Sequence, residues 1–238
     1  MNLGATNETN NGLLYTWGAT AGAQFIEDVE IEYGKRAYSW YDYELSLNGY
    51  SDTYPYIKKY LPSDQPSGYY ATGFSGDKLI TLDNTDDAAR VNFGGDYRLP
   101  TLRHFIELLR DTTNGYVENG KFTKFIYNDS RKYSIPSQDI ENGLTRFSNA
   151  NGYLFFRQSA NSASSAINSN EYLFFPAAGG VGESYVNGIG YYGFYWSSSL
   201  DVNDPLCAWN FGFSQYGASV SSDSYYRCYG YSMRAVIY

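Results

Sequence analysis

Two cysteines, Cys207 and Cys228, are the residues that could most directly supply a nucleophile. A reactive cysteine needs an electropositive setting that favours the thiolate, and in the local sequence only Arg227 offers one. The two residues match neither a metal-binding spacing nor a CxxC motif, and two thiols do not establish a disulfide framework. We therefore predict no catalytic cysteine. The two residues could still form a disulfide in an oxidising compartment.

Hydrolytic chemistry finds little support among the other titratable residues. A Ser–His–Asp arrangement would have to use His104, the single histidine, which falls on the polar face of a predicted helix. Asp86 and Asp87 are interpreted as helix-start charges rather than as a catalytic pair. A further acidic group is typical of a solvated loop: Glu27, Asp28, Glu30 and Glu32. The sequence therefore predicts no catalytic residue and no enzyme.

Calcium-dependent sugar binding requires several clustered oxygen ligands. Calcium-type lectins typically carry Glu-Pro-Asn or Gln-Pro-Asp together with Trp-Asn-Asp. Here Trp209-Asn210 continues with Phe, and Gln65-Pro66 continues with Ser. The sugar-type motif is absent, and we expect neither a metal nor a cofactor.

Tyrosine is the residue type that points to binding. The chain has 238 residues, of which 27 are Tyr, and aromatic residues make up 19%. Tyr combines an apolar ring with a polar hydroxyl, and together with Ser, Gly and Asn it is typical of antibody-like binding loops. Aromatic strands in a β-rich core are the competing interpretation.

The charge balance excludes some partners. A net charge of −8 disfavours nucleic acid and anionic membrane surfaces, because both need clustered Lys and Arg. No stretch is long and apolar enough to span a bilayer, so we expect no membrane insertion. No signal peptide opens the chain, which fits either a lost targeting segment or a protein carried in a virion.

Two helices are expected near the middle of the chain. The first begins at Asn84 or Thr85 and ends at Gly94. The second begins after the N-cap Thr101. Its buried face repeats apolar residues at helical spacing: Leu102, Phe105, Ile106 and Leu109. His104 stands where the usual capping box has Glu, so we expect that box to be incomplete.

The remainder reads mainly as short strands and turns. Residues 122–127 are a candidate strand. Residues 152–156 and 171–175 are near copies that could form an antiparallel hairpin around a long, mobile polar loop. In 209–213 aromatic residues alternate with Asn and Gly, which indicates a strand with one buried face. Helices followed by strands favour a compact α+β domain.

Three patches, taken in order, resemble a known family. They are NLGAT (2–6) with YTWGAT (15–20), then DDAARVNFGG (86–95) with YRLPT (97–101), then FPAAG (175–179) with YWSSS (195–199), AW (208–209) and a stretch ending in SMRAV (232–236). The pattern resembles the variable proteins of diversity-generating retroelements and the related major-paralogous-domain surface proteins of gut-type bacteria and their phages. It covers about the first 20 residues, 77–110 and 171–236, whereas 111–170 matches poorly.

The resemblance implies an α+β C-type-lectin-like fold, with two helices packed on small twisted antiparallel sheets, as a single domain over 1–238. The two helices expected above fit that plan. The strand that the family usually has ahead of residue 2 is missing. We expect a buried framework that includes Trp17, Leu102, Phe105, Ile106, Leu109, Trp196, Trp209, Phe211 and Phe213.

The resemblance also implies the position of a ligand-binding face. In retroelement variable proteins, mutagenised codons place the altered side chains on an exposed surface of the lectin fold. Carried over residue by residue, the ligand-binding positions lie within about 196–238: Leu206, Cys207, Asn210, Gly212, Ser222, Asp223, Ser224, Tyr225, Tyr226, Cys228, Tyr229 and Tyr231. Ordinary strand and turn positions are the competing interpretation of these residues.

The predicted function is ligand or receptor binding through a diversifiable surface, as the tip of a phage tail fibre or as an adhesin at the bacterial cell surface. The implied partner is a host-cell surface protein or glycan, and a homo-oligomer stays open. One alternative is a structural virion or surface protein without a ligand site. The other is an enzyme like the formylglycine-generating oxidases, whose cysteine motif Cys207 and Cys228 do not match.

Overall fold

The computed structural model describes residues 1–24, 38, 40, 43–46, 57–62, 76–182, 185–223 and 225–237. The helical elements in this part are α1 (Ala88–Phe93), α2 (Leu102–Asp111), the 3-10 turn η2 (Thr145–Phe147) and α3 (Ala163–Asn168). The strands are β1 (Leu13–Tyr15), β2 (Ala23–Gln24), β3 (Tyr97–Arg98), β4 (Thr112–Glu118), β5 (Lys121–Asn128), β6 (Tyr133–Glu141), β7 (Gly152–Arg157), β8 (Tyr172–Pro176), β9 (Gly180–Gly182), β10 (Tyr185–Asn187), β11 (Tyr192–Leu200), β12 (Ala208–Ser214), β13 (Gly217–Ser221), β14 (Tyr231–Ser232) and β15 (Val236–Ile237). The predicted acidic loop around Glu27 lies outside the described residues.

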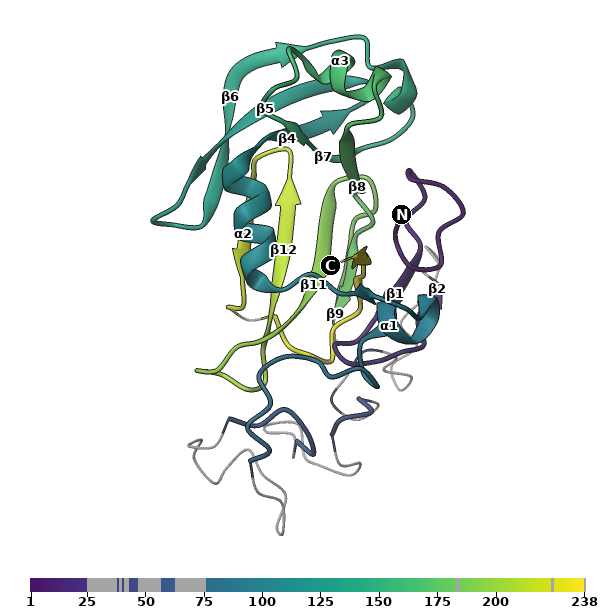
Figure 1. The fold of residues 1–238 in the computed structure, drawn as a ribbon, viewed down its shortest axis with the longest axis vertical. Coiled ribbons are helices and arrows are strands. Elements are labelled where there is room, and N and C mark those ends of the chain that lie inside the picture. Colours follow the sequence, from purple (N-terminus) through teal and green to yellow (C-terminus); the bar gives the residue numbers. More distant parts are fainter. Residues whose placement is uncertain are drawn as a thin grey trace.

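One long sheet organises the molecule. Its strand order is β2-β1-β14-β11-β12-β13-β6-β5-β4-β7-β8, and two small sheets pair β9 with β10 and β3 with β15. Neighbouring strands run antiparallel except β11 and β14, which are parallel. Figure 1 shows β11 and β12 running along the middle of the molecule, with β4 to β7 turned across one end and α2 beside them.

The expected α+β C-type-lectin-like fold is wrong. Strands take up 41% of the residues against 13% for helices, and the sheet curls into a half-barrel instead of forming small sheets under two helices. The physical reason lies largely in 111–170, the segment that matched the family poorly. Its strands extend the sheet and turn aromatic rings inward, so that the Tyr153 and Phe155 centroids lie 5.4 and 5.6 Å from that of Phe211 on β12.

Both expected helices are present, with starts that differ in detail. The first is capped by Asp87, two or three residues later than expected, because the Asp87 carboxylate accepts from the backbone N–H groups of Ala89 and Arg90. The second begins after Thr101 as predicted. Within the described residues, no helix combines the length and the apolar character needed to cross a membrane.

The capping box of α2 is complete, contrary to expectation. Thr101 Oγ1 accepts from the His104 backbone N–H, and His104 Nδ1 accepts from the Thr101 backbone N–H at 3.0 Å. An imidazole nitrogen can accept a hydrogen bond just as a Glu carboxylate does. The single histidine of the chain therefore has a structural role at a helix start.

We expect Thr101→Ala to lower the free energy of unfolding by about 1 kcal/mol, because one backbone N–H loses its capping oxygen. For a chain of this size the loss corresponds to a fall of roughly 2–4 °C in the melting temperature. Differential scanning calorimetry measures it, with Thr101→Ser as the control that keeps a hydroxyl. A melting temperature equal to that of the wild type would show that the cap contributes nothing.

Two local strand predictions are confirmed. The candidate strand 122–127 is the middle of β5. The near copies form β7 and β8, which pair antiparallel with Leu154 opposite Phe174. The polar segment between them contains α3, capped by the Ser162 side chain. The repeat was therefore a correct signal for the hairpin, although its connection holds a helix.

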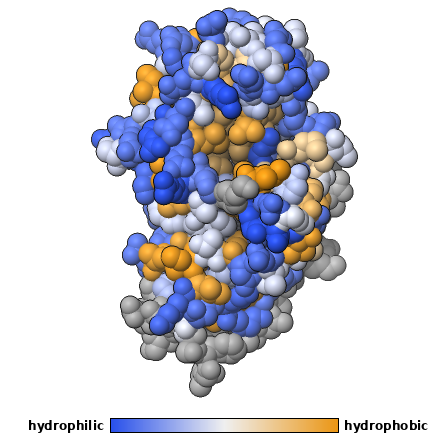
Figure 2. All heavy atoms as spheres, in the orientation of Figure 1, coloured by the Kyte–Doolittle hydropathy of each residue, from blue (hydrophilic) through white to orange (hydrophobic). Residues whose placement is uncertain are grey.

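Strand β11 separates two aromatic cores. Phe194 and Trp196 belong to a cluster that also includes Trp17 from the N-terminal segment. Tyr195 points to the opposite side, into a cluster with Phe211 inside the curled sheet. A strand with both faces buried cannot show simple alternation of apolar and polar residues. On the molecular face shown in Figure 2, hydrophobic residues form separate patches among hydrophilic ones.

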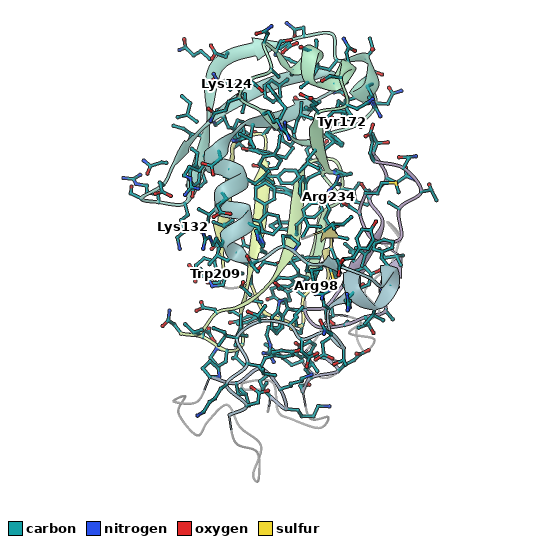
Figure 3. All side chains as sticks on the ribbon, in the orientation of Figure 1. Arg98, Lys124, Lys132, Tyr172, Trp209 and Arg234 are labelled. Atoms are coloured by element: carbon teal, nitrogen blue, oxygen red, sulfur yellow. The ribbon has the colours of Figure 1, made fainter. Side chains whose placement is uncertain are left out.

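Most of the expected framework is buried, namely Trp17, Phe105, Leu109, Trp196, Phe211 and Phe213. Three members are only partly buried: Leu102, Ile106 and Trp209. Trp209 is covered in part by Lys132, from the turn before β6. The Lys132 ammonium lies 4.8 Å from its ring centroid, and Figure 3 places the two residues near one end of α2.

Candidate functional site

The two cysteine side chains pack in the protein interior. Cys207 and Cys228 are both buried, and neither is part of a disulfide. Burial first, and then the neighbouring Asp204 carboxylate, raises the pKa of the Cys207 thiol well above its usual range. A thiol that stays protonated is a poor nucleophile, so the oxidase-like alternative gains no support from this geometry.

The carboxylates near the first helix hold structure together. The Lys59 ammonium donates to Asp83 and Asp86 at 2.5 and 2.7 Å. Asp87 is buried and accepts from the backbone N–H of Leu99 as well as from the helix start. Burial raises the pKa of Asp87, and these backbone donors oppose that shift. Among the described residues, no group of three or more His, Cys, Asp or Glu side chains could hold a metal ion.

The twelve positions taken from the family resemblance are mostly not at the surface. Eight are buried: Leu206, Cys207, Asn210, Gly212, Ser222, Cys228, Tyr229 and Tyr231. Tyr225 and Tyr226 are partly buried, Asp223 is exposed, and Ser224 lies outside the described residues. The expectation that Asn210 and Gly212 face solvent fails because the Phe194 ring covers that side of β12, 3.6 Å from where a Gly212 Cβ would stand.

The tyrosines of this segment pack in the cluster that contains Trp17, Phe194 and Trp196. The Tyr225 ring lies 6.0 Å from those of Phe194 and Tyr231. The Tyr226 ring lies 5.9 Å from that of Trp40 and 5.4 Å from that of Tyr229. Most of their ring surface therefore contacts protein, which leaves little of it for a ligand.

A different set of tyrosines is exposed. Tyr133, Tyr191, Tyr192 and Tyr216 all leave more than a third of their surface open, and Tyr216 reaches 72%. They come from β6, from the start of β11 and from the turn that joins β12 to β13. In sequence they are up to 83 residues apart, so local pattern reading missed them.

Strand register brings three of these tyrosines together. Tyr192 pairs with Ser214, and Ser214 pairs with Gly217 across the β12–β13 turn that contains Tyr216. The Tyr133 ring lies over Gly217, where a Cβ would collide with its hydroxyl. That hydroxyl donates to the Tyr216 carbonyl oxygen at 3.4 Å. Tyr133, Tyr192 and Tyr216 therefore lie around one turn, and Tyr191 adjoins Tyr192 in the chain, with its ring beside Gly188.

Small and aliphatic residues complete this surface. One row across the sheet runs Phe194, Gly212, Ser219, Tyr133, so the smallest side chains stand between two rings. Beside Tyr133, the outward side chains of Ile126 and Ile135 oppose each other on β5 and β6, with 58% and 54% of their surface exposed. We call Tyr133, Tyr191, Tyr192, Tyr216, Ile126 and Ile135 the tyrosine surface.

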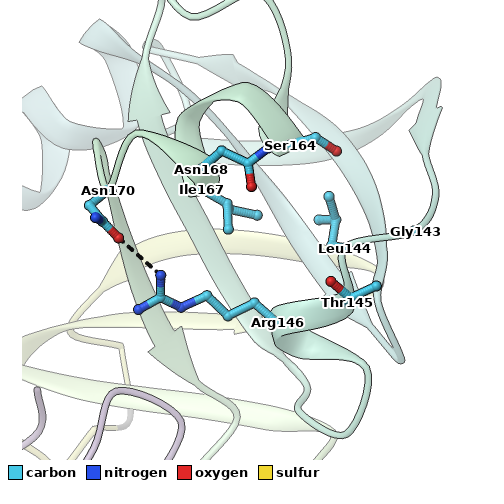
Figure 4. Close-up of a pocket in the computed structure, with 8 residues that line it drawn as sticks. All are labelled: Gly143, Leu144, Thr145, Arg146, Ser164, Ile167, Asn168 and Asn170. Carbon is cyan, nitrogen blue, oxygen red and sulfur yellow. Dashed lines mark hydrogen bonds between the residues drawn. The ribbon is translucent and has the colours of Figure 1, made fainter.

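A separate cavity of about 370 Å³ lies between η2 and α3 (Figure 4). The aliphatic side chains of Leu144 and Ile167 form part of its lining. Thr145, Asn168 and Asn170 supply hydroxyl and amide groups, and the close-up shows the guanidinium of Arg146 hydrogen-bonded to Asn170. None of these residues was predicted, because β7 separates η2 from α3 in the chain.

Comparisons with protein-family models, with curated proteins and with solved structures give no match. The resemblance to retroelement variable proteins is therefore not supported by an independent likeness and stays a prediction. What the described residues do define is a strand-dominated protein with an exposed tyrosine surface and a small polar cavity.

Proposed function

We propose that the chain is a recognition protein that binds a protein partner at a cell surface through the tyrosine surface. The observation that carries this proposal is that three exposed tyrosines, Tyr133, Tyr192 and Tyr216, lie around the β12–β13 turn, with the exposed Tyr191 next to Tyr192 in the chain. Tyr side chains offer large, rigid contact area at low conformational cost, and exposed apolar patches mark interaction sites. The partly exposed serine Ser219 leaves room between rings for a partner's side chains.

The chemistry of the surface favours a protein over a nucleic acid. Its members are uncharged, and the net charge of −8 repels phosphate backbones at long range. Aromatic residues are enriched in protein–protein interfaces, where hot spots favour Tyr and Trp. The buried Cys207 thiol and the structural roles of His104 and Asp87 favour binding without catalysis.

Replacing Tyr191 and Tyr216 together by alanine is expected to weaken partner binding tenfold or more, since each hot-spot residue is worth about 1–2 kcal/mol. These two rings are the most exposed of the set, at 61% and 72%, so unfolding should change by less than about 0.5 kcal/mol per site. Binding of the fluorescently labelled protein to a panel of bacterial cells, read by flow cytometry, measures the effect.

Tyr97→Ala is the matched control, since Tyr97 is exposed on β3 and lies outside the tyrosine surface. Treating the cells with protease should abolish binding of the wild type. Binding that survives protease but is lost after periodate oxidation would assign a glycan partner instead. Equal binding of the double variant and the wild type would exclude the tyrosine surface, and failure to bind any cell would favour the purely structural role.

A further inference from the structure

The cavity between η2 and α3 has a rigid polar edge. Arg146 Nη1 donates to Asn170 Oδ1 at 3.0 Å, and Arg146 Nε donates to Glu8. The guanidinium carbon also lies 5.2 Å from the centroid of the Tyr172 ring. Contacts from two segments, the N-terminal one with Glu8 and the stretch that enters β8 with Asn170 and Tyr172, therefore hold the guanidinium, and only two of its five N–H donors are used by these bonds.

The charge of Arg146 is already matched. Glu8 accepts from Arg146 through one carboxylate oxygen and from the Tyr172 hydroxyl through the other, at 2.6 Å. An anionic ligand would have to compete with that internal carboxylate for the guanidinium. The site is therefore arranged for a neutral ligand that accepts and donates hydrogen bonds.

The remaining groups of the cavity are neutral and directional. The bond from Arg146 makes Asn170 Oδ1 an acceptor, which leaves the Asn170 amide nitrogen as a donor. Neither the Thr145 hydroxyl nor the Asn168 amide makes a hydrogen bond in the part of the chain that the structure describes. Beneath them, Leu144 and Ile167 are buried and present aliphatic carbon.

We propose that this cavity binds a neutral saccharide unit. A sugar ring has hydroxyl groups for the polar edge and a C–H face for aliphatic carbon, which neither an apolar molecule nor a simple anion combines. The volume of about 370 Å³ is near the lower end of ligand pockets, roughly 300–1,000 Å³, so a monosaccharide or disaccharide fills it. The cavity shares no residue with the tyrosine surface, so the experiments test the two proposed binding sites independently.

Saturation-transfer-difference NMR on the full chain tests the proposal. The probes are free glucose, galactose, mannose, N-acetylglucosamine and N-acetylgalactosamine, with the anionic sugar N-acetylneuraminic acid beside them. We expect at least one neutral sugar to bind. The double variant Thr145→Val with Asn168→Leu, which keeps side-chain volume but removes the polar groups, should raise its Kd at least tenfold.

Thr123→Val is the matched control, because Thr123 lies on β5 outside the cavity and should leave the Kd unchanged. Asn168→Trp supplies a second variant, which fills the cavity and should likewise raise the Kd at least tenfold. The proposal is overturned if no neutral sugar binds, if only N-acetylneuraminic acid binds, or if both cavity variants bind a neutral sugar like the wild type.

Discussion

Replacing Phe211 by alanine is expected to lower the free energy of unfolding by about 3–5 kcal/mol. Phe211 is fully buried on β12, in the centre of the curled sheet. Its ring lies within 5.3–5.7 Å, centroid to centroid, of five others: Phe105, Tyr153, Phe155, Phe175 and Phe213. These rings come from α2, β7, β8 and β12, so a cavity at this point removes packing contacts with all four elements.

Chemical denaturation followed by intrinsic fluorescence measures this loss. Phe93→Ala is the matched control, because Phe93 is 51% exposed at the end of α1 and its truncation should cost less than about 1 kcal/mol. Phe211→Leu should fall between the two, since it removes less volume. A loss below about 1 kcal/mol for Phe211→Ala would show that the half-barrel core closes around the gap or does not depend on this ring.

Arg227→Ala is expected to cost roughly 3 kcal/mol or more. Arg227 is fully buried, with its guanidinium carbon 5.2 Å from the Trp17 ring centroid and 5.5 Å from that of Tyr43. Its two terminal nitrogens donate to the carbonyl oxygens of Lys59 and Tyr60, each at 3.2 Å. Alanine leaves a cavity between the rings and leaves both carbonyls without their donor.

The geometry of Arg227 should matter more than its charge. Burial lowers the pKa of the guanidinium, which means that the charged form is costly there. Arg227→Lys keeps the charge but loses the planar stack and the forked donors, so we expect it to lose most of the stability that alanine loses. Arg103→Ala is the control, since its side chain is 84% exposed. A lysine variant as stable as the wild type would contradict this account.

Local features of the fold were readable because their causes lie within a few residues. The apolar spacing and Thr101 predicted α2, and the near-copied segments predicted the β7–β8 hairpin. In both cases the interacting groups are close in the chain or joined by one connection. His104 shows the limit of motif reading, since its ring completes the cap by a chemistry that the usual Glu motif does not describe.

The candidate sites depended on contacts between residues that are far apart in the chain. Tyrosine richness marked a residue type suited to binding, but a Tyr ring packs as well in a core as at a surface. Tyr229 and Tyr231 are buried, whereas Tyr191 and Tyr216 are exposed. Nothing in the neighbouring residues separates these pairs, because burial depends on which distant strand lies alongside.

By itself, the sequence determined the start of α2 at Thr101, the two hairpin strands, the aromatic framework around Trp17, Trp196 and Phe211, and an acidic, tyrosine-rich composition. Only the tertiary structure decided the fold class, because pairings such as Ser219 with Tyr133 join residues far apart in the chain. The same long-range pairing curls the sheet and buries both faces of β11. That is why the segment expected to face a ligand became core, and why Tyr133, Tyr192 and Tyr216 lie around a turn that no local pattern marked.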